Sequence, residues 1–238
     1  MRLDKFLSNN NFVSRTDCKK AAKSGLIKVN GVVVKDTSVK INEDTDIVEY
    51  NGVVVNYRKF TYIMLNKPVG YISSTDDPKK KTVLELLPEN YRSMGLFPCG
   101  RLDIDTTGLL ILTNDGQLAH RLLSPKHHVY KTYYFECSPH LTDESVKQLE
   151  TGVDIGEKEI TKPAILCPDE NMTSGTIAIT EGKFHQIKRM FEQVGSKILK
   201  LRRIKFAEID LDNSLKEGEW RLLTDKETEI LTSLGSNN

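Results

Sequence analysis

A chain of 238 residues with 38% hydrophobic and 28% charged side chains can bury a sizeable core, which excludes a wholly disordered protein. No run approaches the roughly 20 apolar residues of a membrane-spanning helix, and no signal peptide is visible after Met1, so we expect no membrane partner. The four cysteines stand far apart, without a Cys-x-x-Cys pair or a neighbouring His cluster. We therefore expect reduced thiols in a cytoplasmic protein, and neither a disulfide framework nor a metal site.

The formal net charge of +1 conceals two basic segments. Residues 1–40 hold nine Lys and Arg against three Asp, a balance of +6, and residues 183–205 hold eight against one Glu, a balance of +7. The rest of the chain consequently carries −12. This asymmetry predicts a localised basic surface that binds a polyanion such as RNA, and not non-specific binding over the whole protein.

Residues 1–59 have the pattern of a small domain with two helices and two hairpins. Apolar residues recur at helical spacing over 3–7, and a second helix with an apolar face at 18–22 is expected to end at Gly25. Asn-Gly dipeptides at 30–31 and 51–52 stand beside runs of valine and isoleucine, which is the strongest short signal for a hairpin.

The second predicted helix carries lysines on one face, because Lys19 and Lys23 are four residues apart. For any single lysine, a solvated surface position is the simpler interpretation. The order of helices and hairpins together with the charge resembles the S-four RNA-binding module of ribosomal proteins. RNA contacts are accordingly expected at Arg15, Lys19, Lys20, Lys23 and Lys28.

A second domain is expected over residues 60–232. It opens with a strand at 61–65, continues through a turn rich in Pro and Gly at 66–70, and then alternates strands and helices. Residues 233–238 are polar and small for the most part, which predicts a flexible tail.

The stretch from Gly100 to Gly116 combines a carboxylate, an apolar strand and an Asn-Asp-Gly turn. Asp103 lies just before the strand at 109–112, and a carboxylate on a loop braced by a buried strand is well placed for catalysis. On spacing alone, Asp103 could equally be a turn or cap residue. A metal ion would need further ligands, and no His is near in the sequence.

This stretch, GRLDIDTTGLLILTNDG, resembles the active-site motif of pseudouridine synthases of the RsuA type, which isomerise uridines in ribosomal RNA. The resemblance implies that Asp103 is the catalytic nucleophile. Asp105 falls at a variable position of the motif and Asp115 falls in the turn, so we assign both of them structural roles.

Two further motifs extend the resemblance. Lys131-Thr132-Tyr133 matches the K-x-Y motif of the family, which implies that Tyr133 stacks on the target uracil. Residues 181–191 match the family's His-Gln-apolar-basic motif on an amphipathic helix, which implies that Lys188 faces Asp103. A nearby cation keeps a carboxylate ionised.

The remaining predicted site residues are RNA contacts. Arg101 is expected to enter the RNA where the target nucleotide leaves the stack, since a planar guanidinium stacks well on bases. The polar side of the amphipathic helix and the basic run near residue 202 are expected to line the RNA path. These residues are His185, Gln186, Arg189, Arg202 and Arg203.

The resemblance covers nearly the whole chain and implies an α+β fold. A small S-four-like domain precedes a catalytic domain whose sheet is mixed, mainly antiparallel, and has a central cleft. The implied reaction is isomerisation of uridine in small-subunit (16S) ribosomal RNA without a cofactor. The expected partner is ribosomal RNA or an assembly intermediate of a ribosomal subunit, bound by a monomer. The alternatives are a sister enzyme of large-subunit RNA, a base-excising glycosylase and a non-catalytic ribosome-assembly factor.

Overall fold

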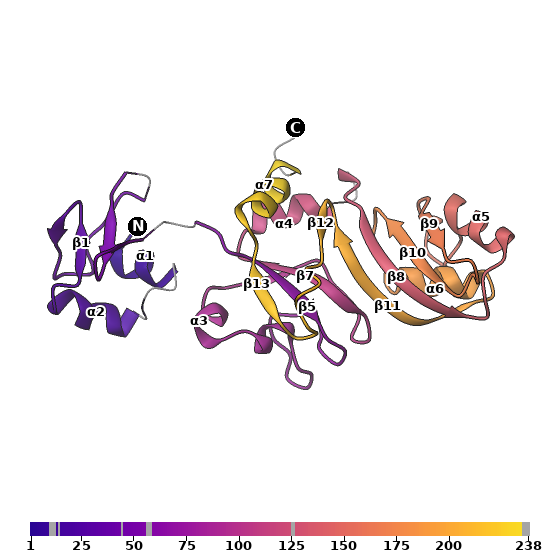
Figure 1. Ribbon diagram of the computed structural model, residues 1–238, viewed down its shortest axis with the longest axis horizontal. Helices are drawn as coiled ribbons and strands as arrows, with labels where there is room; N and C mark the ends of the chain where they lie inside the picture. Colours follow the sequence, from indigo (N-terminus) through magenta and orange to yellow (C-terminus); the bar gives the residue numbers. More distant parts are fainter. Residues whose placement is uncertain (10–12, 14, 44, 56–58, 125–126, 235–238) are drawn as a thin grey trace. The chain divides into compact units, whose positions relative to one another are not determined.

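Residues 1–9, 13, 15–43, 45–55, 59–124 and 127–234 are described by the computed structural model shown in Figure 1. The chain forms two units. One consists of Met1–Thr61 with Pro88–Gly95, and the other consists of Tyr62–Leu87 with Leu96–Asn238. Among the described residues, none of the helices has the length and apolar character needed to cross a membrane.

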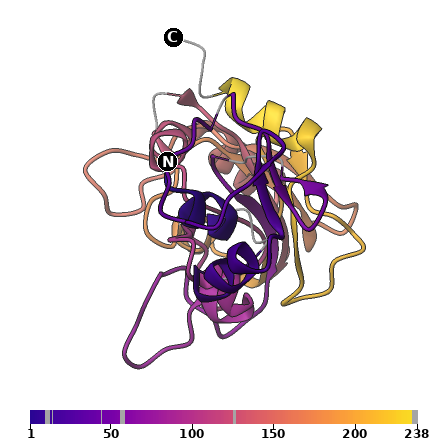
Figure 2. The ribbon, with the colours of Figure 1, turned by 90° about the vertical axis from the view of Figure 1, so that its left-hand side faces the viewer.

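The first unit joins two helices to a small antiparallel sheet (Figures 1 and 2). In the part that the structure describes, the sheet has four strands in the order β2-β1-β3-β4. Apolar side chains of both helices and of β1 and β3 enclose a common core. The elements are α1 (Leu3–Asn9), α2 (Arg15–Lys23), β1 (Ile27–Val29), β2 (Val32–Val33), β3 (Val48–Tyr50), β4 (Val53–Val54) and, later in the chain, α3 (Glu89–Arg92).

Both predicted hairpins are present. Asn30 and Gly31 have φ angles of 50° and 79°, and Asn51 and Gly52 have 50° and 78°. Positive φ at both central residues matches the right-handed twist of the strands, which is why Asn-Gly is favoured there. The second helix ends before Gly25, as expected from its sequence.

The second unit is built around one large sheet. Over the described residues, seven strands follow the order β13-β5-β7-β11-β8-β10-β9, with β6 added to β7 and β12 to β11. The β7–β11 pair is parallel and the other pairs are antiparallel. The sheet is therefore mixed and mainly antiparallel, which confirms the predicted fold class.

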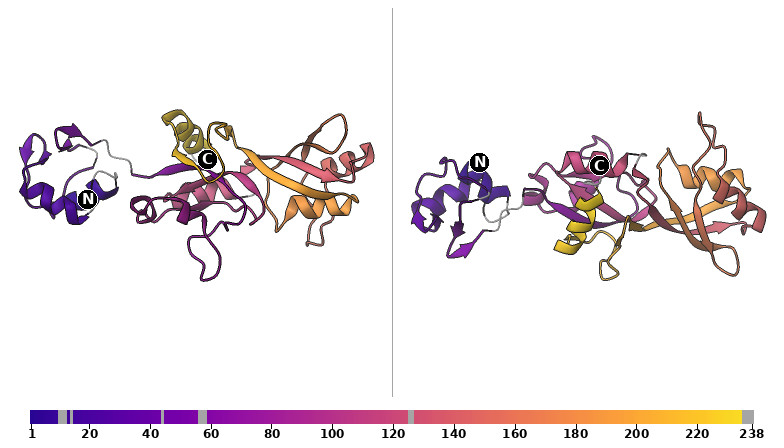
Figure 3. Two further views of the ribbon diagram at one scale, coloured as in Figure 1. Left: turned by 60° about the horizontal axis from the view of Figure 1, so that its bottom comes forward. Right: turned by 90° about the horizontal axis from the view of Figure 1, so that it is seen from above.

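Figures 1 and 3 show β8 and β11 as long curved strands that run side by side. The strands of this unit are β5 (Tyr62–Lys67), β6 (Phe97–Cys99), β7 (Thr107–Thr113), β8 (Lys131–Ser138), β9 (Ile165–Pro168), β10 (Ser174–Ile179), β11 (Lys197–Phe206), β12 (Ile209–Asp210) and β13 (Trp220–Leu222). Its helices are η1 (Val83–Leu86), α4 (Gly116–Leu123), α5 (Asp143–Thr151), α6 (Gln186–Gln193) and α7 (Asp225–Leu234).

Two features bear on the bounds of the predicted domains. Helix α7 continues to Leu234, two residues into the predicted tail, because the buried Leu231 anchors its last turn and Ser233 bonds back to the carbonyl of Ile230. Residues 235–238 lie outside the described part. The segment Pro88–Gly95 belongs to the first unit although it follows β5, and no local pattern in the sequence signals that return.

Candidate active site

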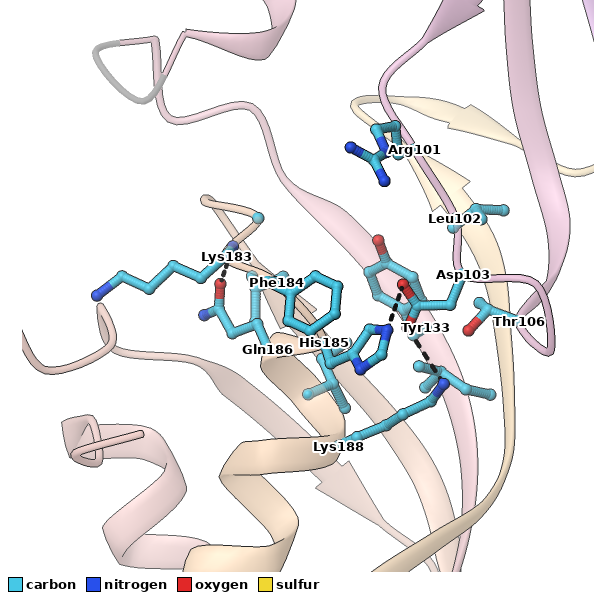
Figure 4. Close-up of a pocket in the computed structure, with 14 residues that line it drawn as sticks. Arg101, Leu102, Asp103, Thr106, Tyr133, Lys183, Phe184, His185, Gln186 and Lys188 are labelled. Atoms are coloured by element: carbon cyan, nitrogen blue, oxygen red, sulfur yellow. Dashed lines mark hydrogen bonds and ion pairs between the residues drawn. The ribbon is translucent and has the colours of Figure 1, made fainter. Parts of the chain in front are cut away.

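Asp103 lies in the loop between β6 and β7, on the wall of a pocket with a volume of about 230 Å³ (Figure 4). All seven residues of β7 are buried, so the strand that follows the loop is rigidly held in the sheet. The pocket is lined by Arg101, Leu102, Asp103, Thr106, Tyr133, Ile179, Gly182, Lys183, Phe184, His185, Gln186, Ile187, Lys188 and Leu201.

The backbone of the Asp103 loop is held by a buried lysine from β5. The Nζ atom of Lys67 lies 2.8 Å from the carbonyl oxygen of Thr106, 3.0 Å from that of Asp103 and 3.1 Å from that of Pro68. The carbonyl oxygen of Ile104 is 3.5 Å away. The side chain of Lys67 is fully buried, and burial lowers its pKa to about 8. One ammonium group thus gathers the carbonyls of Asp103 and of the loop residues that follow it.

Other bonds fix the same loop from the turn that follows β5. The hydroxyl of Ser73 accepts a hydrogen bond from the amide of Leu102 and donates one to its carbonyl oxygen, both at 3.0 Å. The amide of Gly70 donates to the carbonyl oxygen of Ile104 at 2.8 Å. Asp103 therefore stands on a loop whose backbone is bonded on either side of it, which is the rigidity that a catalytic group needs.

The sheet register aligns the loop with the predicted tyrosine. Gly108 of β7 pairs with Arg203 of β11, and Arg203 pairs in turn with Tyr133 of β8. Gly108 has a φ of 100°, and a Cβ atom there would collide with the backbone of Arg203, so only glycine permits this close pairing. Tyr133 is 7% exposed and faces the same pocket as Asp103.

Lys188 of α6 is shared between two carboxylates. Its Nζ atom lies 3.1 Å from Oδ2 of Asp103 and 2.5 Å from Oδ1 of Asp105. Burial alone would lower the pKa of Lys188, but the hydrogen bonds and charges of the two aspartates outweigh burial and raise it. Burial likewise opposes ionisation of Asp105, and the bond and charge of Lys188 reverse this effect, so its pKa is lowered.

His185 completes the polar wall of the pocket beside Asp103. Its Nε2 atom is 3.7 Å from Oδ1 of Asp103, and its ring stacks on that of Phe184 with centroids 3.8 Å apart at 21°. His185 adopts left-handed backbone angles, with φ at 49°, immediately before α6. This bend turns the two rings toward the pocket, as Figure 4 shows.

Three predicted RNA contacts are bonded inside the protein, and the structure contradicts the prediction for Arg203. It is 1% exposed, its Nε atom donates to the carbonyl oxygen of Leu109 at 2.6 Å, and its guanidinium lies 5.4 Å from the ring centre of Phe206. A buried guanidinium has no surface to offer RNA. Arg203 instead ties β11 to β7 through this bond. Alternate residues of a strand face opposite sides of a sheet, and its neighbour Arg202 is half-buried.

Gln186 is also buried, at 4% exposure, although it lines the pocket. Its Oε1 atom accepts from the amide of Lys183 at 2.9 Å, and its Nε2 atom donates to Oε1 of Glu181 at 2.8 Å. Both of its polar atoms are thus used inside the protein, where they close the turn before α6.

Arg189 is the third of these residues. Its guanidinium pairs with Glu157 at 2.8 Å and donates to the carbonyl oxygen of Phe184 at 3.0 Å and to that of Ile155. These partners use three of the five N–H donors of the guanidinium. Arg189 therefore anchors the loop before α6 to the segment at 155–157.

The other predicted contacts lie on the surface wherever the structure describes them. Arg101 is exposed and lines the pocket, on the side away from Lys188 in Figure 4. The lysines of the first unit are exposed too, and one of them, Lys20, pairs with Asp17 at 3.2 Å. Arg15 begins α2, but its side chain lies outside the described part. The exposed lysines of this unit are Lys19, Lys20, Lys23 and Lys28.

Sequence reasoning missed three residues that shape the site: Lys67, Ser73 and Asp105. A lysine at the end of a fully buried strand, directly before Pro68, was a signal for Lys67, because an unpaired ammonium group is rarely buried. Asp105 was assigned a structural role, and its bond to Lys188 places it beside Asp103. No pattern in the sequence marks Ser73.

The chemistry available in this pocket is that of a carboxylate, an ammonium group, an imidazole and a buried phenol. Within the described residues, no group of three or more His, Cys, Asp and Glu side chains gathers to bind a metal ion. A fixed carboxylate in a pocket, in a chain that also carries a basic helix and hairpin module, is an arrangement that suits an enzyme acting on RNA.

Comparisons with known proteins specify the class. Residues 61–193 match the RNA pseudouridylate synthase family, and residues 1–47 match the S4 domain. The chain therefore belongs to the RNA pseudouridylate synthase family, and it is an isomerase with an S4 RNA-binding domain at its N-terminal end.

Individual relatives agree over nearly the whole length. The uncharacterized RNA pseudouridine synthase YtzG of Bacillus subtilis is 44% identical over 234 residues, which are 97% of this chain and 98% of the relative. The ribosomal small subunit pseudouridine synthase A of Escherichia coli is 40% identical over 95% of this chain and 98% of its own. A crystal structure of a pseudouridylate synthase shares 39% identity and a TM-score of 0.69, and covers 97% of this chain and 99% of its own.

Proposed function

We propose that this protein converts a specific uridine of small-subunit ribosomal RNA to pseudouridine, with Asp103 as the nucleophile. The substrate rests on relatives from Escherichia coli, Yersinia pestis and Haemophilus influenzae, which are named ribosomal small subunit pseudouridine synthase A and are 40–41% identical to this chain. Identity over at least 95% of the chain includes both the S4 domain and the catalytic unit, so it extends to the parts that choose the RNA.

The observation that carries the role of Asp103 is its placement. Its carboxylate lines the pocket, bonds to Lys188 at 3.1 Å, and stands on a loop held by the ammonium group of Lys67. The bond to Lys188 fixes the carboxylate at the pocket wall, and a carboxylate can act as a nucleophile. Asp105 shares the cation but is 61% exposed at its side chain, so it is the weaker candidate for contact with an enclosed nucleotide.

The reaction requires the target uridine to leave its stack and enter the pocket, which costs a few kcal/mol. Tyr133 supports this step, because its buried ring lines the pocket and can stack on the uracil. The N1–C1′ bond then breaks, the uracil turns, and a C5–C1′ bond forms, while C5 loses a proton and N1 gains one. Isomerisation conserves every atom, so the reaction needs no cofactor.

The exposed lysines of α2 and β1 suit contacts with the RNA backbone, which position a substrate without reading its bases. The proposed partner is ribosomal RNA, either free or in an assembly intermediate of the small subunit. The protein is proposed to act as a monomer in the cytoplasm, where this substrate is made and assembled.

The decisive experiment is chemical mapping of pseudouridine in ribosomal RNA from a strain that lacks this protein. We expect one small-subunit position to lose its modification, wild-type protein to restore it, and Asp103→Asn to fail. Loss of a large-subunit position instead would assign the alternative substrate. Release of free uracil by the purified protein would identify a glycosylase, because an isomerase releases nothing.

A further inference from the structure

Phe184 presents an aromatic ring to solvent at the edge of the pocket. It is 68% exposed, and it lines the same pocket as Asp103 and Tyr133. Single exposed apolar side chains are common on protein surfaces and need no special cause. The position of this one, beside an enclosed carboxylate, calls for a closer look at what holds it.

The ring of Phe184 is braced by the neighbouring His185. The imidazole of His185 stacks on this ring with centroids 3.8 Å apart and planes 21° apart, so it covers one face of Phe184. The side chain remains 68% exposed in spite of this contact. His185 in turn lies 3.7 Å from the carboxylate of Asp103. The two rings therefore form a short stack, the Phe184–His185 stack, that leads from the carboxylate out to the solvent (Figure 4).

The backbone under this stack is fixed by long-range bonds. Arg189 donates to the carbonyl oxygen of Phe184 at 3.0 Å, and Gln186 accepts from the amide of Lys183 at 2.9 Å. The Nζ atom of Lys183 bonds to the carbonyl oxygen of Glu159 at 2.5 Å. Because these bonds already fix the turn, the backbone under Phe184 loses little conformational freedom when a ligand binds.

We propose that the Phe184–His185 stack receives the base next to the target uridine. The target uracil itself needs the enclosed wall near Tyr133 and Asp103, whereas Phe184 stands at the open edge, where the adjoining nucleotide passes. Each base has a flat apolar face, so aromatic stacking tolerates any base and holds the strand in register. This inference rests on the proposed reaction and adds a positioning residue to it.

The test uses a stem-loop from the RNA in which the wild-type protein makes pseudouridine. 2-Aminopurine replaces the base on the 5′ side of the target in one RNA and the base on the 3′ side in another. Both RNAs are bound to full-length Asp103→Asn protein with Phe184 intact, with Phe184→Leu or with Phe184→Tyr. We expect one of the two RNAs to lose fluorescence on binding to Phe184 and Phe184→Tyr proteins, and to keep it with Phe184→Leu.

Kinetics with otherwise wild-type protein give a second reading. Phe184→Leu is expected to raise KM roughly tenfold with kcat unchanged, because stacking is equally strong before and during reaction. Phe184→Tyr is expected to stay within about twofold of wild type, since it keeps the ring. The matched control is Leu199→Ala, which alters another exposed apolar side chain, 66% exposed and outside the pocket lining.

Fluorescence that does not depend on residue 184 in either RNA would overturn the inference. So would an unchanged KM in Phe184→Leu. A fall in kcat alone would also overturn it, because it would mean that Phe184 acts on the reacting base. If the modified RNA is not small-subunit ribosomal RNA, the proposed substrate is wrong, while the stacking test proceeds on the RNA that is modified.

Discussion

Lys67 offers the sharpest test of how the fold prepares the pocket. Lys67→Met keeps a long apolar stem in the core but removes the group that bonds to the carbonyls of Pro68, Asp103 and Thr106. Among the described residues, no hydrogen bond or ion pair joins Lys67 to the carboxylate of Asp103. Lys67 therefore acts on the reaction through the loop backbone and through the charge interaction between the two groups. Lys67 is in this sense a positioning residue.

The magnitude follows from two opposing effects. A hydrogen bond from a charged donor contributes roughly 1.5–3 kcal/mol, and Lys67 makes three that are no longer than 3.1 Å. Against this stands the burial of its charge, since lowering the pKa of Lys67 from 10.5 to about 8 corresponds to roughly 3 kcal/mol. The bonds win, and Lys67→Met is expected to lower the free energy of unfolding by roughly 3 kcal/mol.

The effect on turnover should be larger than the effect on folding. A displacement of about 1 Å at a catalytic group can cost roughly a hundredfold in rate, so we expect kcat to fall by about that factor while KM changes little. Urea denaturation measures the stability, and pseudouridine formation under folded conditions measures kcat. Lys80→Met, the same change at an exposed loop position, is the control. Full kcat in folded Lys67→Met protein would refute the anchoring of the loop.

The pH dependence gives an independent check. Because the pKa of Lys67 is lower in the folded protein than its ordinary 10.5, the unfolded chain binds more protons between about pH 8 and pH 10.5. The stability of the wild type should therefore rise relative to Lys67→Met across that interval. A constant difference from pH 7 to pH 11 would show that Lys67 is not shielded from water.

The other predictions concern charged groups on or near the RNA path. Asp103→Asn should abolish pseudouridine formation and leave RNA affinity within about threefold of wild type. Asp105→Asn should keep most of the pseudouridine-forming activity. Equal losses of activity in the two variants would contradict the distinction between the two aspartates. Lys188→Met should cost roughly 1 kcal/mol of stability. This cost should shrink as pH falls below 3.8, because the pKa of Asp105 is lowered on folding. It should also shrink as pH rises above 10.5, because the pKa of Lys188 is raised on folding. A cost that persists at both extremes would contradict the pairing. Lys19→Gln combined with Lys23→Gln should reduce the slope of log affinity against log salt by about 2, and an unchanged slope would remove both lysines from the phosphate contacts.

Local signals in the sequence predicted the elements well. The Asn-Gly turns depend only on the two residues that adopt positive φ, so Asn30 and Asn51 predict hairpins without knowledge of the rest of the chain. The apolar spacing at Ile187, Met190 and Phe191 similarly predicts α6, whose buried face consists largely of those side chains.

Cationic and polar residues were harder to place, because their partners lie far away in the sequence. Lys67 bonds to carbonyls 36 to 39 residues further on, and Arg203 bonds to Leu109, 94 residues away. A basic residue within a basic run looks solvent-exposed, and only the sheet register shows that Arg203 faces inward. Arg189 likewise has two partners more than 30 residues away, whereas the partners of Gln186 lie only three and five residues away, in the turn before α6.

The hydrogen bond between Arg203 and Leu109 also bears on when the pocket can form during synthesis of the chain. At roughly 5–20 residues per second, a ribosome needs roughly 5–20 seconds to add the 94 residues that separate the two partners. Until then β7 lacks its parallel neighbour, and the nascent chain holds no finished pocket. A polypeptide released before β11 is complete therefore carries the sequence motif around Asp103 without a finished pocket.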